Sequence, residues 1–142
     1  MAGLPEAVVD ASAACKWFVP EVYSEAALAL RDAHADGRIR VIAPDLLSYE
    51  VANTLRHHPA MSPDRLRSAM RHFFDLQIAL VPPSSALLGL ASGYAYREKL
   101  TIYDAVYAVL AESRSCRWVT ADARLLGASR RAVPISQWML GY

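Results

Sequence analysis

The stretch Ala7-Val8-Val9-Asp10-Ala11-Ser12 constrains the fold more than any other part of the sequence, because an apolar run ends there in a carboxylate and a hydroxyl. A continuous apolar run is typical of a strand in a parallel sheet whose two faces are both covered by helices. Ligands bind such sheets outside the carboxyl ends of the strands. Asp10 is therefore expected at that edge, although the same residue would also suit a turn or the N-cap of a following helix.

The rest of the chain alternates between short apolar runs and helical periodicity. Further strands are expected over residues 38–43, 78–81, 116–120 and 133–135. Helical patterns cover residues 13–19, 22–34, 44–55, 63–76, 84–91, 102–114 and 122–126, and Ser12 is a candidate cap for the first of them. Strands that alternate with helices in this way predict an α/β fold, a three-layer α/β/α sandwich with a mostly parallel central sheet.

Length and composition narrow the class of protein. With 142 residues the chain has the size of one domain, so we expect a single domain over residues 1–142. The 15 Lys and Arg against 14 Asp and Glu create no overall field that would attract nucleic acid, so a nucleic-acid site must be a local patch. No apolar segment approaches the length of a membrane span, which favours a cytoplasmic protein that does not contact membranes. Cys15 and Cys116 lack metal-site spacing and are expected to be reduced core residues, with a disulfide as the alternative.

Four acids stand at particular places in this predicted fold. Asp10 and Asp122 each follow a strand, whereas Glu50 and Asp104 lie in helices and have apolar neighbours. If the sheet is parallel, the first two meet at one edge and the packed helices can bring the other two to it. One such acid alone is better explained as a cap, a surface charge or an ion-pair partner, but four such placements together favour a common site.

Carboxylates that gather closely raise one another's pKa, and a divalent cation relieves this conflict. Ligation by oxygen alone, without Cys or convergent His, selects Mg²⁺ or Mn²⁺ rather than zinc. These ions polarise phosphoryl oxygens, so metal-assisted hydrolysis of phosphodiester bonds is the natural chemistry. We expect Asp10, Asp104 and Asp122 to bind the ion directly, and Glu50 to bind a second ion or to orient water.

Several blocks together resemble the PIN-domain family, and more narrowly the VapC-type toxins of toxin–antitoxin pairs. The resemblance covers nearly the whole chain, and the blocks are Val8-Val9-Asp10-Ala11-Ser12, Trp17-Phe18-Val19-Pro20-Glu21, Glu50-Val51-Ala52-Asn53-Thr54-Leu55, Thr101-Ile102-Tyr103-Asp104-Ala105 and Val119-Thr120-Ala121-Asp122. It implies an endoribonuclease dependent on Mg²⁺ or Mn²⁺, with metal-binding acids at Asp10, Glu50, Asp104 and Asp122. Supporting roles fall to Ser12, Asn53 and Thr120. The implied partners are RNA, a VapB-like antitoxin and a second copy of the chain in a homodimer.

The most basic part of the chain combines residues 56–58 with Arg65, Arg67, Arg71 and His72. This segment fits an RNA backbone or an acidic antitoxin segment, and equally a solvated helix face paired with Asp64 and Asp75. Tyr103 and Tyr107 share a helix face and are expected to build a packing or dimer surface, with base stacking as the alternative. Arg124 is expected at the surface, with a phosphate contact as the alternative.

Other functions for an Asp that follows a strand fit less well. A signalling receiver domain needs a Lys after a late strand, and neither Lys16 nor Lys99 stands there. A haloacid-type phosphatase needs a second Asp two residues after the first, where this chain has Ser12. The serious rival is a catalytically silent module of the same fold that binds RNA or an antitoxin without cleavage.

Overall fold

The computed structural model describes residues 3–140, and all five strands of its central sheet run parallel. The strand order is β3-β2-β1-β4-β5, so β1 and β4 are neighbours in the middle of the sheet although more than a hundred residues separate them. The strands are β1 (Glu6–Val9), β2 (Arg40–Pro44), β3 (Ala79–Val81), β4 (Arg117–Thr120) and β5 (Ala132–Pro134). This topology confirms the predicted parallel α/β fold.

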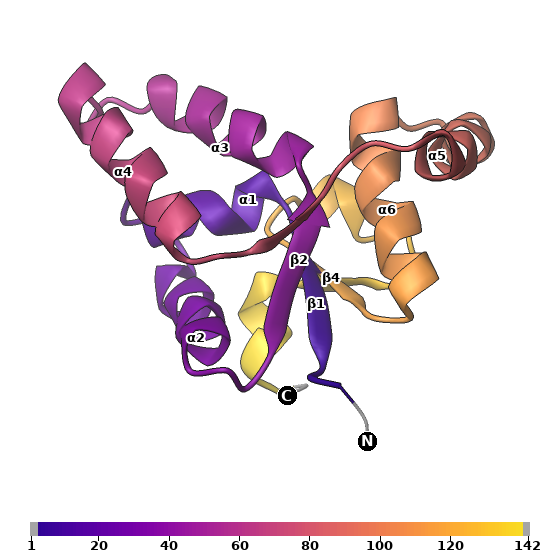
Figure 1. Ribbon diagram of the computed structural model, residues 1–142, viewed down its shortest axis with the longest axis horizontal. Helices are drawn as coiled ribbons and strands as arrows, with labels where there is room; N and C mark the ends of the chain where they lie inside the picture. The colour runs from indigo at the N-terminus through magenta and orange to yellow at the C-terminus, as the bar shows by residue number, and fades with distance from the viewer. Residues whose placement is uncertain (1–2, 141–142) are drawn as a thin grey trace.

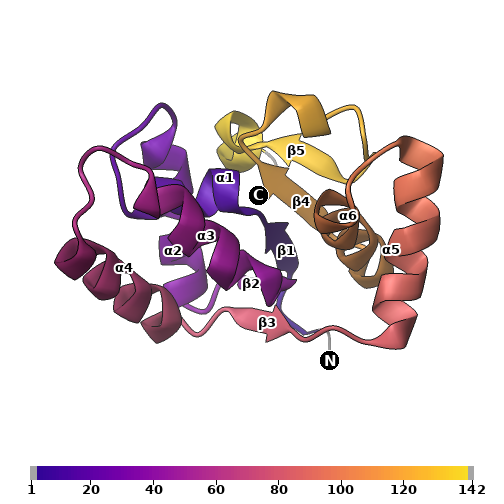
Figure 2. The ribbon, with the colours of Figure 1, turned by 90° about the horizontal axis from the view of Figure 1, so that it is seen from above.

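Helices cover both faces of the sheet. Figures 1 and 2 show α1 to α4 on one side of the strands and α5 and α6 on the other, which gives three layers. The α-helices are α1 (Ala11–Ala14), α2 (Ser24–Ala35), α3 (Leu46–Arg56), α4 (Pro63–Asp75), α5 (Ser85–Glu98) and α6 (Ile102–Arg114). Three short 3₁₀ helices are η1 (Cys15–Trp17), η2 (Ala123–Leu125) and η3 (Ile135–Leu140).

Side-chain caps explain where several helices begin. The hydroxyls of Ser62, Ser84 and Thr101 accept a backbone N–H from the first turns of α4, α5 and α6. The expected cap at Ser12 is wrong, because Asp10 is the N-cap of α1 and accepts the N–H of Ala13. Ser12 lies one residue inside the helix, which leaves its hydroxyl free for contacts across the sheet edge.

The core consists of the apolar strand residues and the helix faces packed on them. Trp118, Tyr107 and Phe73 are its largest fully buried side chains. Cys15 is buried and Cys116 is half-buried, and both are free thiols, as expected from their spacing. Within the part of the chain that the structure describes, no helix is long and apolar enough to cross a membrane.

His34 ties three elements together through both of its ring nitrogens. Nδ1 accepts the Val41 N–H at 3.0 Å, so Nε2 carries the proton and donates to the Leu76 carbonyl oxygen at 2.7 Å. These bonds join α2 to the start of β2 and to the end of α4. We expect His34→Ala to lower the free energy of unfolding by about 1–3 kcal/mol, measured by urea denaturation, because two partly buried backbone groups lose their partners.

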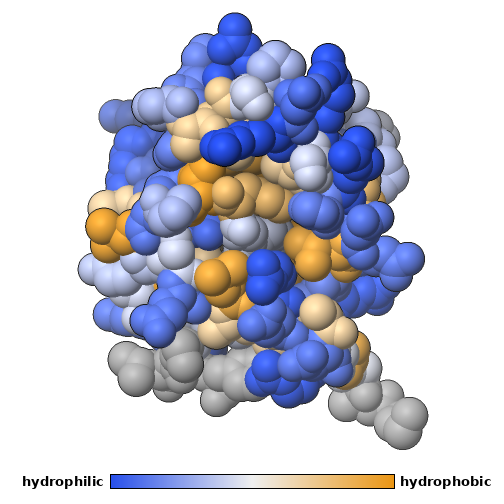
Figure 3. Space-filling view, turned by 90° about the vertical axis from the view of Figure 1, so that its left-hand side faces the viewer, coloured by the Kyte–Doolittle hydropathy of each residue, from blue (hydrophilic) through white to orange (hydrophobic). Residues whose placement is uncertain are grey.

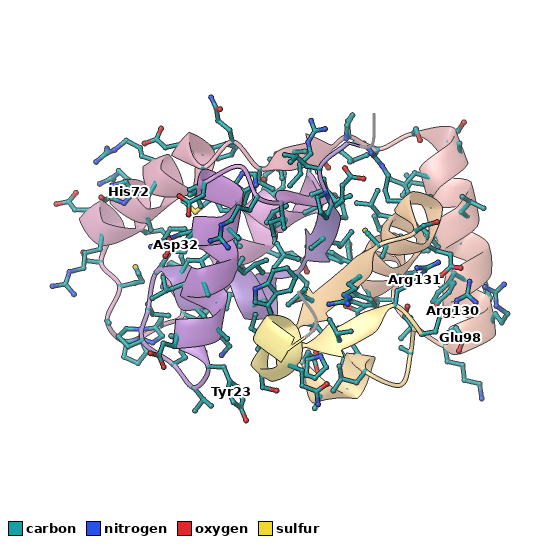
Figure 4. The ribbon with its side chains drawn as sticks, turned by 90° about the horizontal axis from the view of Figure 1, so that it is seen from below. Tyr23, Asp32, His72, Glu98, Arg130 and Arg131 are labelled. Carbon is teal, nitrogen blue, oxygen red and sulfur yellow. The ribbon has the colours of Figure 1, made fainter. Side chains whose placement is uncertain are left out.

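His72 provides the matched control for this substitution. It is exposed on α4 (Figure 4) and makes no side-chain hydrogen bond with another described residue. His72→Ala is expected to change the free energy of unfolding by less than about 0.5 kcal/mol. Equal effects of the two substitutions would contradict a structural role of His34.

Candidate active site

The site forms at the carboxyl edge of the sheet, where β1 and β4 end side by side. The parallel pairing of Val9 with Val119 places Asp10 next to Thr120. Asp122 follows two residues later, at the start of η2. Seen from above in Figure 2, this edge lies between α1 and α3 on one side and α6 on the other. The predicted meeting of Asp10 and Asp122 at one edge therefore follows from the strand order.

Asp10 is 6% exposed and both of its carboxylate oxygens accept hydrogen bonds. Oδ1 accepts the Ser12 hydroxyl at 2.6 Å and the Ala13 N–H at 3.3 Å. Oδ2 accepts the indole N–H of Trp118 at 3.0 Å. Burial raises the pKa of Asp10 above its ordinary value, and the surrounding donors offset this only in part. The carboxylate is thus held in a fixed orientation but is short of positive charge.

Two hydroxyls connect Asp10 to the end of β4. The Oγ atom of Ser12 lies 3.2 Å from Oγ1 of Thr120 and accepts the Ala121 N–H at 2.9 Å. Thr120 is buried, and its Oγ1 accepts the N–H of Asp122 at 3.1 Å. Ser12 and Thr120 therefore lie beside the predicted acids, and they fix the chain segments that carry Asp10 and Asp122.

Glu50 reaches the site from α3 and is held by Tyr107 of α6. The Tyr107 hydroxyl donates to Glu50 Oε1 at 2.6 Å, and the Tyr107 ring stacks on Trp118 with 6.0 Å between ring centroids. Burial raises the pKa of Glu50, and the nearby charges of Asp10 and Asp104 raise it further, whereas the Tyr107 hydrogen bond lowers it. Glu50 therefore lies close enough to both of these acids for their charges to affect its ionisation.

Asp104 and Asp122 form the outer part of the site and share one arginine. Arg124 Nη2 donates to Asp122 Oδ2 at 3.0 Å and to Asp104 Oδ2 at 3.2 Å. Asp104 lies in the first turn of α6, after the Thr101 cap, and Asp122 caps η2 through the Arg124 N–H. All four predicted acids thus belong to one continuous network, from Asp10 to Asp122.

The acids do not converge on a single point. Within residues 3–140, no three Asp, Glu, His or Cys side chains come close enough together to enclose a metal ion. Each acid instead accepts hydrogen bonds from its own donors, which are Ser12 and Trp118 for Asp10, Tyr107 for Glu50 and Arg124 for the other two. Like charges in a partly buried site repel, so separate donors are the favoured arrangement of the carboxylates alone.

The donor atoms suit a hard divalent cation. They are carboxylate and hydroxyl oxygens, without sulfur or imidazole, which is the ligand type that Mg²⁺ and Mn²⁺ prefer. Burial raises the pKa of Asp10 and of Glu50, and a bound divalent cation would stabilise their charged forms. The guanidinium between Asp104 and Asp122 marks the place where a cation is already favoured.

Three residues around the site have roles that the sequence pattern did not predict or predicted only in part. Tyr107 is buried and binds Glu50, so it packs but does not form a surface, whereas Tyr103 is exposed. Trp118 lies in an apolar run of the sequence, and this pattern gives no sign that its indole N–H binds Asp10. Asn53 is exposed on α3 and makes no side-chain hydrogen bond with another described residue, so the structure does not bring it into the network.

Comparisons with known proteins agree with this arrangement. The sequence profile of the PIN domain matches residues 7–130. Ribonuclease VapC3 of Pyrobaculum aerophilum is 34% identical over 122 residues, which cover 83% of this chain and 90% of that protein. VapC ribonuclease Mb0985 of Mycobacterium bovis is 31% identical over 135 residues, which cover 91% of this chain and 95% of that protein.

Solved structures show the same fold. PAE2754 from Pyrobaculum aerophilum superposes with a TM-score of 0.70 and 26% identity, over 96% of this chain and 93% of that chain. FitAcB from Neisseria gonorrhoeae superposes with a TM-score of 0.63 and 16% identity, over 89% of this chain and 95% of that chain. The profile match spans β1 to the loop before β5 and so includes all four acids. By its sequence, its sheet topology and the acids at the carboxyl edge, the chain belongs to the PIN domain family.

Proposed function

We propose that this chain is a ribonuclease of the VapC type, which hydrolyses RNA phosphodiester bonds with Mg²⁺ or Mn²⁺ and acts as the toxin of a toxin–antitoxin pair. The observation that carries the proposal is the joining of Asp10, Glu50, Asp104 and Asp122 into one network at the carboxyl edge of a parallel sheet. The names of the relatives, which are VapC ribonucleases, support RNA as the substrate.

In this mechanism Asp10, Asp104 and Asp122 would hold the cation, and Glu50 would orient the attacking water or hold a second ion. A bound divalent ion lowers the pKa of water and neutralises charge on the scissile phosphate. Tyr107 fixes the Glu50 carboxylate by its hydroxyl, and Trp118 fixes Asp10 by its indole N–H. Ser12 and Thr120 keep the two strand ends in register, so that the acids stay oriented while RNA binds.

The proposed antitoxin site is the groove between α3 and α4, with a volume of about 1100 Å³. Figure 3 looks onto the side of the molecule that carries α4, where hydrophobic side chains are exposed among hydrophilic ones. Met61, Leu66 and Phe74 line the groove together with Arg56 and Arg71. An amphipathic helix with acidic side chains fits an apolar floor with basic residues beside it. The exposed ion pair between Arg67 and Asp64 matches the alternative of a solvated face for that part of α4.

A homodimer belongs to the same proposal. Leu88, Leu90 and Tyr96 on α5 are exposed, by 40%, 59% and 89%. Large exposed apolar side chains on a helix are available for contacts with another protein surface. We assign this helix to contacts between two copies of the chain, which analytical ultracentrifugation tests.

Cleavage of RNA by the purified protein tests the function directly. We expect RNA of mixed sequence to be cut with Mn²⁺ or Mg²⁺ and to stay intact with EDTA, because the acids lack an ion that activates water. Sequencing of the new RNA ends identifies the bond that is cut. Asp122→Asn, purified in the same way, is expected to lose most of this activity and so excludes a contaminating nuclease.

The rival function, binding without cleavage, makes the opposite prediction. A silent module would bind RNA or an antitoxin equally well with and without the ion, and no new RNA ends would form. Intact RNA in the presence of Mn²⁺, with confirmed folding of the protein, would overturn the proposed nuclease.

A further inference from the structure

The outer acids of the site share a single nitrogen atom. Arg124 Nη2 lies 3.0 Å from Asp122 Oδ2 and 3.2 Å from Asp104 Oδ2, so one donor bridges two carboxylates that come from η2 and α6. A positive group thus stands between Asp104 and Asp122 in the protein itself.

The backbone near Arg124 is anchored in the core, whereas its side chain is exposed. The Arg124 N–H donates to Asp122 Oδ1 at 3.0 Å, and the next residue, Leu125, is 3% exposed and anchors η2 in the core. The Arg124 side chain is 65% exposed and contacts solvent along much of its length. The guanidinium can therefore leave the two carboxylates by side-chain rotation, without a change in the fold.

A divalent cation and the guanidinium compete for these oxygens. Nη2 of Arg124 lies within hydrogen-bond distance of both Oδ2 atoms, on which an ion held by Asp104 and Asp122 would also depend. Two positive charges at such a short distance repel each other. Binding of one therefore opposes binding of the other.

We propose that Arg124 is a built-in competitor of the divalent cation, which must displace the guanidinium from Asp104 and Asp122 in order to bind. Arg124 then sets the metal affinity of the site without being a ligand. This inference rests on the proposed function, because it takes Asp104 and Asp122 as ligands of the ion. It predicts that a neutral residue at position 124 strengthens metal binding, the opposite of the loss expected for a residue that assists the ion.

Direct titration of the protein with Mn²⁺ tests the competition. Free Mn²⁺ is followed by electron paramagnetic resonance, with the wild-type chain and Arg124→Gln, both freed of metal beforehand. We expect the dissociation constant of Arg124→Gln to be about three- to tenfold lower, since two exposed charge pairs no longer oppose the ion. The rise of the unfolding temperature with added Mn²⁺ is expected to be larger in the variant.

Arg130 supplies the matched control. It is exposed (Figure 4) and pairs with Glu112. Glu112 lies eight residues after Asp104 on α6 and thus about 12 Å further along the helix. Arg130→Gln removes the same charge and is expected to leave the Mn²⁺ dissociation constant unchanged within about twofold. An equal gain in Mn²⁺ affinity in both variants would mean that the loss of any nearby positive charge has this effect, and it would overturn the proposal.

The titration also separates failure of the inference from failure of the function. If Mn²⁺ binding is lost in Asp122→Asn but is equal or weaker in Arg124→Gln than in the wild-type chain, the metal site is supported and the competitor role of Arg124 is overturned. Absence of Mn²⁺ binding in both the wild-type chain and Arg124→Gln overturns the metal site, and the competitor with it. Tighter binding in Arg124→Gln alone supports both.

Discussion

Asp104→Asn is expected to reduce metal-dependent RNA cleavage by about 10²- to 10³-fold, because a carboxylate that holds the ion at the scissile phosphate is lost. The substitution should leave the fold intact. The Asp104 side chain is 19% exposed, and its only side-chain hydrogen bond among the described residues comes from the exposed Arg124. Single-turnover cleavage of a labelled RNA, at saturating Mn²⁺, measures the effect.

Asp64→Asn is the control for Asp104→Asn. Asp64 also lies in the first turn of a helix, α4, and also pairs with an arginine, Arg67, at 2.8 Å. The loss of a first-turn acid costs each helix about 0.3–1 kcal/mol through the helix dipole. Both variants should therefore show similar small changes in unfolding temperature, whereas only Asp104→Asn should lose cleavage. Full activity of Asp104→Asn would remove this acid from the site.

The parts of the site that the sequence could predict are those determined by strand order. Asp10 and Asp122 each follow an apolar run, and the carboxyl ends of neighbouring parallel strands meet at one edge. Glu50 and Asp104 could also be predicted, because helices that pack on the sheet can bring these two acids to the same edge. The pairing of β1 with β4 was not in the sequence pattern, because periodicity identifies strands but not their neighbours.

The hydrogen-bond partners of the acids could not be predicted in this way. Trp118 in a strand and Tyr107 in a helix have the hydropathy of core residues, and only the packing of α6 on β4 decides where their polar atoms point. Ser12 was expected to cap α1, but Asp10 takes that role and so serves both the helix and the site. A cap and a metal ligand have the same residue preference, so residue type alone does not separate these two roles.

Each of the four acids accepts a hydrogen bond from Trp118, Tyr107 or Arg124. Each of these bonds stabilises a carboxylate that is at least partly buried. Trp118 and Tyr107 are buried, whereas the Arg124 side chain is 65% exposed. The inner acids are therefore held in place permanently, and the outer pair is held by a group that can leave. A cation is expected to enter from the side of Arg124.

Trp118→Phe is expected to lower the free energy of unfolding by about 2–4 kcal/mol at neutral pH. Trp118 is fully buried, and its indole N–H donates to Asp10 Oδ2 at 3.0 Å. A hydrogen bond to a charged group contributes about 1.5–3 kcal/mol, and the smaller ring leaves a cavity. Urea denaturation at a series of pH values measures both contributions.

The dependence on pH identifies the part of this loss that comes from Asp10. Without the donor, the pKa of Asp10 in the folded chain rises further above its unfolded value. The folded variant then binds more protons than the unfolded chain, so its stability falls as the pH rises through the interval between the two pKa values. Trp17→Phe is the control, since Trp17 is also buried but donates to the neutral Ala27 carbonyl at 2.8 Å. Its deficit should not vary with pH, and parallel curves for the two variants would show that the Trp118 hydrogen bond does not support the charged form of Asp10.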